Sequence, residues 1–281
     1  MRTRLAGMRV TVVGCAGSFP GPDSPASCYL IEHDGTAIVL DLGNGSLGAL
    51  QRHIELSRID AVLLTHLHVD HCIDLTSFYV FRKYHPGGVL PPIPVFGPAG
   101  TAQRMAAAYG LEDDPGMTDV FDFAPISDGR GGPAQFEIGP LRITTTPVVH
   151  PVEAYAVRVD AAGNSVVYSG DTAPTPALID LAHGADIALF EASYLDIRYA
   201  DARYADGGYA GEDHGEGHSD GVHLTARQAG EHAAAAGVDE LVLTHLVAWN
   251  DRAASVREGS AGFGRDVILA TTGLTLTRDS H

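Results

Sequence analysis

The sequence feature that most constrains the fold is the stretch VLLTHLHVDHCIDL, in which an aliphatic run leads directly into three histidines and an aspartate. The run Ala61 to Thr65 has the length and composition of a buried strand, and the loop after such a strand can hold side chains rigidly toward a cleft. His66 and His68 are two residues apart and can face one point. Asp70 and His71 begin the next predicted helix and can face a second point nearby. We therefore expect four metal-ligating side chains at the end of one strand.

Similar residues recur at the ends of other predicted strands. His150 follows TTTPVV, Asp171 follows SVVYSG and His245 follows DELVLT. A lone histidine in such a place is more often a satisfied polar residue than a ligand, and Gly-Asp after a strand is ordinary turn chemistry. Because these residues recur at several strand ends, a shared metal site explains them better than separate turns do.

Apolar periodicity and turn residues predict the secondary structure. Strands are expected at Met8 to Cys15, Ser27 to Glu32, Ala37 to Leu40, Ala61 to Thr65, Ile93 to Phe96, Leu141 to Thr146, Ala154 to Val159, Ser165 to Tyr168, Ile187 to Glu191, Glu240 to Thr244, Val267 to Ala270 and Leu274 to Thr277. Helices are expected at Gly45 to His53, Asp70 to Tyr84, Gly100 to Tyr109, Thr175 to His183 and Thr225 to Ala236. Strands that lead into helices in both halves predict an α/β fold of two packed sheets with helices outside.

Length and composition favour one domain. With 281 residues and 45% hydrophobic content, the chain can bury a large core, and no polar or low-complexity linker divides it. We expect a single domain over residues 1–281, with a Gly- and Asp-rich insertion at 196–221 near the site. His214 and His218 in this insertion are interpreted as solvated loop residues.

Cysteine usage and hydropathy bear on the compartment. Cys15, Cys28 and Cys72 are widely spaced and contain no Cys-x-x-Cys pair, which is typical of reduced, buried thiols. The chain has no apolar run of about eighteen residues, and its N-terminal region passes into strand-like alternation instead of a signal peptide. We expect a cytoplasmic protein without membrane contact.

The charge balance restricts the substrate. The formal net charge is −17, and Lys83 is the only lysine among 18 basic residues. A long nucleic acid needs clustered cations to displace its counterions, so it is not an expected partner. A small anionic substrate remains compatible, because two bound divalent metals would offset the negative charge locally. A homodimer is also compatible with the sequence.

The motif HLHVDH resembles the His-x-His-x-Asp-His hallmark of the metallo-β-lactamase superfamily. The matches continue in order through Asp41 in IVLDLGNG, His150, Asp171 in SGDT and His245 in LTHL, so the resemblance covers nearly the whole chain. It implies an αβ/βα sandwich of two packed mixed sheets flanked by helices, with two metal ions at one edge. By this resemblance, Asp41 orients the ligand loop.

The resemblance also implies a ligand set. One metal would be held by His66, His68 and His150, the other by Asp70, His71 and His245, with Asp171 between them. Zinc suits the imidazole-rich set, and the carboxylates also admit manganese or iron.

Branches of the superfamily differ around these ligands. Flavodiiron-type reductases have a carboxylate where this chain has His68, so they are disfavoured. The ribonuclease Z and cyclic phosphodiesterase branch adds a Glu and a His, which stand here as Glu191 in LFEASYLD and His223 in VHLTARQ, with Leu224 in place of the usual Ser. The resemblance places both with Asp70 among the catalytic residues, with His223, supported by Glu191, assisting the leaving oxygen of a phosphodiester. The alternative for His223 is a residue that merely precedes a helix starting at Thr225.

Within this branch, ribonuclease Z carries a long basic arm between its third and fourth motifs, whereas here His150 and Asp171 are separated by one short hairpin. The stretches VVGCAGSFPGPDSPASCYL, LGALQRH and RKYHPGG instead resemble an actinobacterial group of atypical class II cyclic nucleotide phosphodiesterases, whose usual HxHLDH is HLHVDH here. We therefore predict a dinuclear metal-dependent phosphodiesterase that hydrolyses a small cyclic nucleotide, 3′,5′-cyclic AMP, to 5′-AMP.

Three alternatives to this function stay open. The first is a ribonuclease Z-like endonuclease that processes tRNA 3′ ends. The second is a carboxylic ester, thioester or lactone hydrolase on the same metals, which would not need His223. The third is a non-catalytic, zinc-stabilised module, although structural zinc sites are usually closed, four-coordinate and often rich in cysteine.

Overall fold

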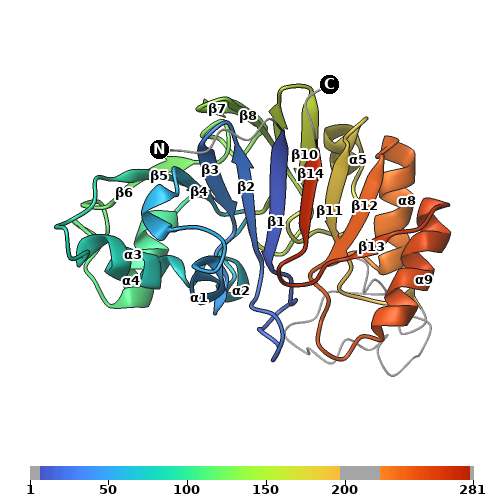
Figure 1. Cartoon of the computed structure of the whole chain (residues 1–281), viewed down its shortest axis with the longest axis horizontal. Coiled ribbons are helices and arrows are strands. Elements are labelled where there is room, and N and C mark those ends of the chain that lie inside the picture. Colours follow the sequence, from blue (N-terminus) through green and yellow to red (C-terminus); the bar gives the residue numbers. More distant parts are fainter. Residues whose placement is uncertain (1–6, 197–221, 279–281) are drawn as a thin grey trace.

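Two seven-stranded mixed sheets pack face to face, and helices cover their outer faces (Figure 1). The computed structural model describes residues 7–196 and 222–278. This arrangement confirms the predicted αβ/βα sandwich. The expectation of a single domain over 1–281 stays a prediction.

The first sheet has the order β14-β1-β2-β3-β4-β5-β6. Its strands are β1 (Met8–Gly14), β2 (Cys28–His33), β3 (Thr36–Leu40), β4 (Ala61–Leu63), β5 (Ile93–Gly97), β6 (Phe121–Pro125) and β14 (Thr275–Arg278). Strands β14, β1, β2 and β3 pair antiparallel, and β3 to β6 pair parallel. In the antiparallel part, Ile31 lies opposite Val10 on one side and Ile38 on the other.

The second sheet has the order β13-β12-β11-β10-β9-β8-β7 and likewise consists of an antiparallel and a parallel part. Its strands are β7 (Ala134–Ile138), β8 (Leu141–Pro147), β9 (Tyr155–Ala161), β10 (Asn164–Tyr168), β11 (Ile187–Glu191), β12 (Glu240–Thr244) and β13 (Ile268–Leu269). Strands β7 to β10 pair antiparallel, and β10 to β13 pair parallel. Parallel strands bring their carboxyl ends to one edge, which is where α/β sheets commonly place ligands.

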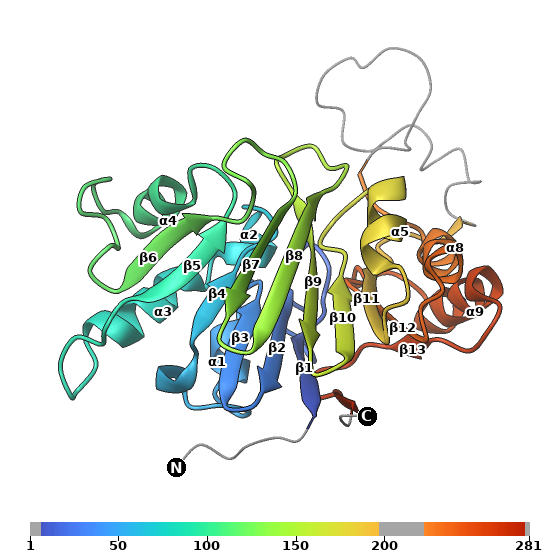
Figure 2. The ribbon, with the colours of Figure 1, turned by 90° about the horizontal axis from the view of Figure 1, so that it is seen from above.

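The helices lie on the two flanks of the sandwich, with α3 and α4 on one side and α5, α8 and α9 on the other (Figure 2). The helical elements are α1 (Ser46–Leu50), the 3₁₀ helix η1 (Leu56–Arg58), α2 (Val69–Cys72), α3 (Leu75–Lys83), α4 (Thr101–Tyr109), α5 (Pro176–Ala182), α8 (Ala226–Ala236) and α9 (Arg252–Phe263). Thr225 starts α8 with a capping box. Its side chain accepts a hydrogen bond from the Gln228 backbone amide, and its own backbone amide donates to Gln228 Oε1.

Three apolar clusters hold these layers together. Between the sheets, Tyr29 and Ile31 of the first sheet share a buried cluster with Val157 and Val159 of the second. A second cluster joins the first sheet to the helices on its outer side, and a third joins the second sheet to α5, α8 and α9. Burial on both faces explains why the strands read as near-continuous apolar runs.

Several predicted elements differ from the structure. The single helix expected from Asp70 to Tyr84 is two, α2 and α3, with Asp74 accepting from the Leu47 amide where they meet. Strands β6 and β7 were not predicted, because β6 ends in Pro125 and β7 is an edge strand with alternating partial burial. Helix α9 was not predicted either.

The predicted insertion at 196–221 lies, apart from Asp196, outside the described residues, and so do His214 and His218. Among the residues that are described, no helix is long and apolar enough to cross a membrane.

Candidate metal centre

The residues expected at the site lie together at the edge where the parallel strands end. The loop after β4 carries His66 and His68, and α2 carries Asp70 and His71. From the second sheet come three further side chains, listed by the elements that they follow: His150 after β8, Asp171 after β10 and His245 after β12. Neither sheet alone supplies the whole group, so the centre forms where the sheets meet.

Asp41, directly after β3, holds the segment from Thr65 to His71, which carries four of the expected ligands, through hydrogen bonds. Its side chain is fully buried and its backbone is left-handed, with φ of 56°. The carboxylate accepts from the Thr65 amide at 2.7 Å, the Thr65 hydroxyl at 2.9 Å, His71 Nδ1 at 2.7 Å and the Tyr168 hydroxyl at 2.9 Å. Such strain persists only where the surroundings fix it, and here the donors do so. Asp41 therefore fixes how His71 faces the centre.

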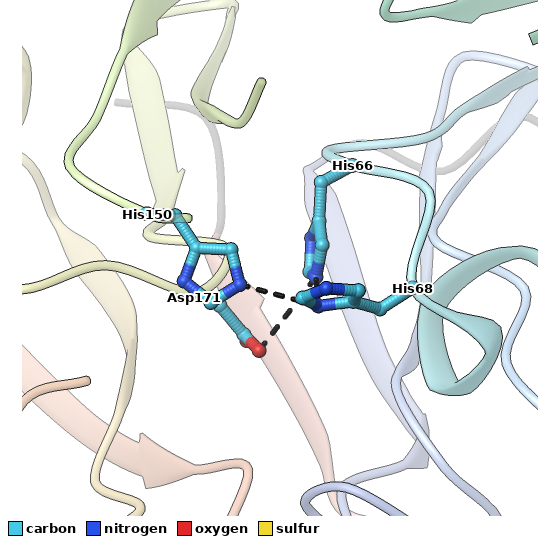
Figure 3. Close-up of side chains that lie close together, drawn as sticks. All are labelled: His66, His68, His150 and Asp171. Atoms are coloured by element: carbon cyan, nitrogen blue, oxygen red, sulfur yellow. Dashed lines mark hydrogen bonds and ion pairs between the residues drawn. The ribbon is translucent and has the colours of Figure 1, made fainter. Parts of the chain in front are cut away.

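The first group consists of His66, His68, His150 and Asp171, whose polar atoms point at one another (Figure 3). His68 Nδ1 lies 3.0 Å from His66 Nε2 and 3.2 Å from His150 Nε2. Asp171 Oδ2 lies 3.7 Å from His66 Nε2. Ligand atoms bound tetrahedrally to zinc at about 2.0–2.1 Å are themselves about 3.3 Å apart, so these separations suit one ion.

The second group consists of Asp70, His71, His245 and Asp171, all buried. His245 Nε2 lies 3.2 Å from His71 Nε2 and 3.2 Å from Asp70 Oδ2. Asp171 Oδ1 lies 3.3 Å from His71 Nε2 and 3.5 Å from His245 Nε2. One oxygen of Asp171 thus faces each group, as a carboxylate between two ions would.

Hydrogen bonds on the outer side of the rings show which nitrogens lack a proton. The Thr65 hydroxyl donates to Asp41, so His66 Nδ1 must donate to Thr65; likewise His71 Nδ1 donates to Asp41. His150 Nδ1 donates to the Val222 carbonyl oxygen.

The same reasoning covers His245. Ser193 Oγ donates to oxygen acceptors, Glu191 Oε2 at 2.7 Å and the His245 carbonyl at 3.1 Å, so His245 Nδ1 donates to Ser193. In the neutral form of these histidines, the inward Nε2 atoms therefore present lone pairs to one another. Asp171 Oδ1 is buried and has no hydrogen-bond partner among the described residues. Lone pairs that face one another repel, and a buried carboxylate oxygen needs a partner, so bound cations would stabilise both. The residues therefore fit a pair of metal ions.

The pKa shifts of the first group agree with this donor set. Burial lowers the pKa of His66 well below its usual value, and burial also lowers the pKa of His68 and of His150. For Asp171, burial opposes ionisation, but His245 and His71 hold its pKa well below the usual range. Neutral imidazoles and ionised carboxylates are the forms that bind metals.

Asp70 and His71 show that the second group attracts positive charge. Burial opposes ionisation of Asp70, yet hydrogen bonds with His245 and His71 lower its pKa. Burial likewise opposes protonation of His71, but the carboxylates of Asp171 and Asp41 raise its pKa well above the usual value.

His223 and Glu191 form a pair beside the two groups. His223 Nδ1 lies 3.0 and 3.1 Å from the oxygens of Glu191, which is fully buried at the end of β11. Burial disfavours protonation of His223, but Glu191 outweighs it and raises the pKa to about 9. Thr225 caps α8 without help from His223. The His223 ring stacks on His245 with centroids 5.7 Å apart, so it faces the centre.

Two residues near the site were not foreseen from the sequence. Ser193 links Glu191 to His245, and its position two residues after Glu191 is the only signal that the sequence offered. Tyr168 reaches across from the second sheet to Asp41, and nothing in its strand distinguishes it from a core residue.

Comparisons with known proteins place this chain in a family. A model of the beta-lactamase superfamily domain matches residues 36–246. An uncharacterized protein of Mycobacterium leprae is 40% identical over 273 residues, which are 95% of this chain and 88% of the relative. A ribonuclease Z of Mycobacterium avium is 31% identical over 254 residues, which are 85% of this chain and 86% of the relative.

A solved structure agrees with these relatives. The crystal structure of the metallo-beta-lactamase fold protein YhfI from Bacillus subtilis superposes with a TM-score of 0.78 at 25% identity, covering 97% of this chain and 100% of that one. The sequence of YhfI, a probable metallo-hydrolase, is 28% identical over 95% of this chain and 98% of the relative. The chain therefore belongs to the metallo-β-lactamase superfamily, among the metallo-hydrolases of the branch that includes ribonuclease Z and phosphodiesterases.

Proposed function

We propose that this protein is a dinuclear metal-dependent phosphodiesterase that hydrolyses a small cyclic nucleotide, 3′,5′-cyclic AMP, to 5′-AMP. The observation that carries the proposal is the Glu191–His223 pair, in which a partly exposed histidine that faces the ligand groups is held by a buried carboxylate. A histidine held by a carboxylate beside a metal pair suits an alkoxide leaving group, which needs a proton. A thioester hydrolase on the same metals would not require it, because a thiolate departs without a proton.

The proposed ligands are His66, His68 and His150 for one ion and Asp70, His71 and His245 for the other, with Asp171 shared. Two divalent ions held there would lower the pKa of a bound water and neutralise charge on a phosphate. Zinc suits the imidazoles, and manganese or iron remains compatible with the carboxylates. We assign Asp70 a second task, orienting the attacking water, because its ionised carboxylate can accept a hydrogen bond from a water held at the second group.

His223 has the geometry of a leaving-group acid. Its Nδ1 proton is held by Glu191, which leaves Nε2 as the atom that can donate to substrate. Its side chain is 13% exposed, whereas that of Glu191 is wholly buried. Glu191 is therefore a positioning residue that fixes the ring and stabilises its charged form, and His223 donates the proton to the departing 3′ oxygen.

The segment between His150 and Asp171 supports a small substrate over tRNA. It contains only the β9–β10 hairpin, whose strands pair antiparallel from Asn164 opposite Ala161 to Tyr168 opposite Val157. The segment contains no inserted basic arm, and the chain has 35 acidic against 18 basic residues. A polyanion as long as tRNA would meet repulsion over such a surface. The identity with ribonuclease Z keeps tRNA processing as the second candidate.

A substrate panel tests the proposal. Purified protein at matched metal loading would be assayed with 3′,5′-cyclic AMP, 3′,5′-cyclic GMP, 2′,3′-cyclic AMP, bis(p-nitrophenyl) phosphate, a precursor tRNA and a thioester. We expect the highest kcat/KM with a 3′,5′-cyclic nucleotide. Cleavage of the tRNA at its 3′ end with no turnover of cyclic nucleotides would assign the second candidate instead. Turnover of the thioester alone would move the protein to the carboxyl-ester hydrolases.

A further inference from the structure

Exposed apolar side chains gather around the candidate metal centre. In the described part of the chain, the exposed large apolar residues outside the region of α3 and α4 lie on segments that carry or touch the proposed ligands. Val69 is the first residue of α2, and the others are on loops: Phe19, Val149, Val152 and Trp249. Single exposed apolar residues need no explanation, but a group around one site indicates a binding surface. Two members of this group, Phe19 and Trp249, are aromatic and contact each other.

The loop of Phe19 is held against the second ligand group. The Gly17 amide donates to the Leu246 carbonyl at 3.0 Å, and the Ser18 amide nitrogen lies 3.5 Å from His245 Nε2. A Cβ at Gly17 would lie only 2.4 Å from the His245 carbonyl oxygen, so a side chain there would push this loop away. The close approach places Phe19 next to the centre.

Trp249 is presented by an anchored loop. Four residues before it, His245 ends the ligand set, and directly after it Asn250 is buried and donates to the Ser193 carbonyl at 2.8 Å. Ser193 itself contacts His245. The loop is thus fixed on both sides of Trp249, while the indole is 54% exposed. A ring exposed to this extent contributes little to packing of the core.

Phe19 and Trp249 together form an aromatic platform. Their ring centroids are 5.7 Å apart with planes inclined at 43°, and Phe19 is 41% exposed. We propose that this platform stacks on the base of a nucleotide whose phosphate lies at the two metals, so that Phe19 and Trp249 select nucleotides over aliphatic phosphodiesters. The proposal rests on the proposed function in taking a nucleotide as substrate. Because every base offers a π-face, the platform would favour purines by their larger area without separating adenine from guanine.

Binding of the product tests the platform without catalysis. Trp249 is the only tryptophan in the chain, so the intrinsic fluorescence of the metal-loaded protein reports on this one ring. Titration with 5′-AMP should change the fluorescence saturably, whereas ribose 5-phosphate and inorganic phosphate should leave it nearly unchanged. An equal response to 5′-AMP and ribose 5-phosphate would overturn the proposal.

Calorimetry on variants completes the test. Trp249→Ala should weaken 5′-AMP binding by about tenfold or more, the loss expected for one base stack, and leave ribose 5-phosphate binding unchanged. Trp249→Phe should recover most of the affinity for 5′-AMP. Tyr84→Ala, which removes a 66% exposed aromatic side chain at the end of α3, is the control and should leave 5′-AMP binding unchanged. An unchanged 5′-AMP affinity in Trp249→Ala would refute the platform.

The two proposals fail separately. If the platform is right and the phosphodiesterase proposal is right, Trp249→Ala should raise KM for 3′,5′-cyclic AMP while kcat stays within a few fold. If wild-type protein hydrolyses no cyclic nucleotide yet 5′-AMP still changes the fluorescence and ribose 5-phosphate does not, the platform stands and the proposed reaction falls. Hydrolysis of cyclic AMP without a base-dependent change in fluorescence would instead support the proposed reaction and overturn the platform.

Discussion

Replacing His223 by Ala separates leaving-group assistance from metal chemistry. The variant removes the contacts of 3.0 and 3.1 Å between His223 Nδ1 and the Glu191 oxygens. Glu191 still accepts hydrogen bonds from the Thr172 amide at 2.6 Å and the Ser193 hydroxyl at 2.7 Å. The buried carboxylate is therefore not orphaned, and the loss of stability should stay near the roughly 1.5–3 kcal/mol of one charge-assisted hydrogen bond. We expect the fold to survive.

The catalytic loss should depend on the leaving group. A positioned general acid contributes about 10²-fold or more, or about 2.7 kcal/mol of barrier, when the leaving group is a poor alkoxide. For 3′,5′-cyclic AMP, kcat of His223→Ala should thus fall by about 10²-fold. For bis(p-nitrophenyl) phosphate, whose phenolate needs little protonation, the fall should be much smaller.

The assay compares kcat on both substrates at equal metal content, measured by elemental analysis of the same samples. His232→Ala is the matched control, because His232 accepts from the Thr175 amide and donates to the Gln228 carbonyl, away from the ligand groups. That variant should leave the ratio of the two rates unchanged. Equal losses on both substrates in His223→Ala, at full metal occupancy, would show that His223 is not the leaving-group acid.

Three further predictions concern the ligands and their support. Asp171→Asn should lower the occupancy of both metal sites, because one carboxylate oxygen faces each group, and elemental analysis that finds only one ion lost would contradict the bridge. His66→Ala or His245→Ala should abolish hydrolysis while circular dichroism stays native, and activity retained in both would refute the site assignment. Asp41→Asn turns an amide group toward the donors of Thr65, His71 and Tyr168, so it should lower metal affinity by about 10–100-fold in a chelator competition. Unchanged affinity would show that Asp41 does not orient the ligand loop.

The sequence predicted the elements with strong local patterns. The buried strands β4, β10, β11 and β12 are short apolar runs. A predicted site residue ends β11 and follows each of the others within a few residues, so both the strands and the loops after them could be located. The motif spacing also placed Asp70 and His71 at the start of a helix, which is α2. The pairing of Glu191 with His223 followed from resemblance, since the two lie 32 positions apart.

Elements that depend on tertiary packing could not be predicted. Helix α9 has almost no apolar periodicity, and its contact with α8 relies on small residues: a Cβ at Gly262 would lie 2.2 Å from the Arg227 carbonyl oxygen. The one local signal was Asp251, whose side chain caps the helix. Ser193, Tyr168 and the aromatic platform were missed for a related reason, because their roles come from neighbours that are distant in sequence.

The division of the proposed ligands between the sheets would make the metal ions a cross-link. His66, His68, Asp70 and His71 come from the first sheet, and the remaining ligands come from the second, so each ion would join the two halves of the sandwich at one edge. Metal binding energy at such a seam is also folding energy for the loops that form it. Chelation should therefore open this edge first, with hydrogen exchange rising in the ligand loops while the apolar centre around Tyr29 and Val157 stays protected. Metal supply in the cell would then set how much of the protein is competent to act, independently of how much is made.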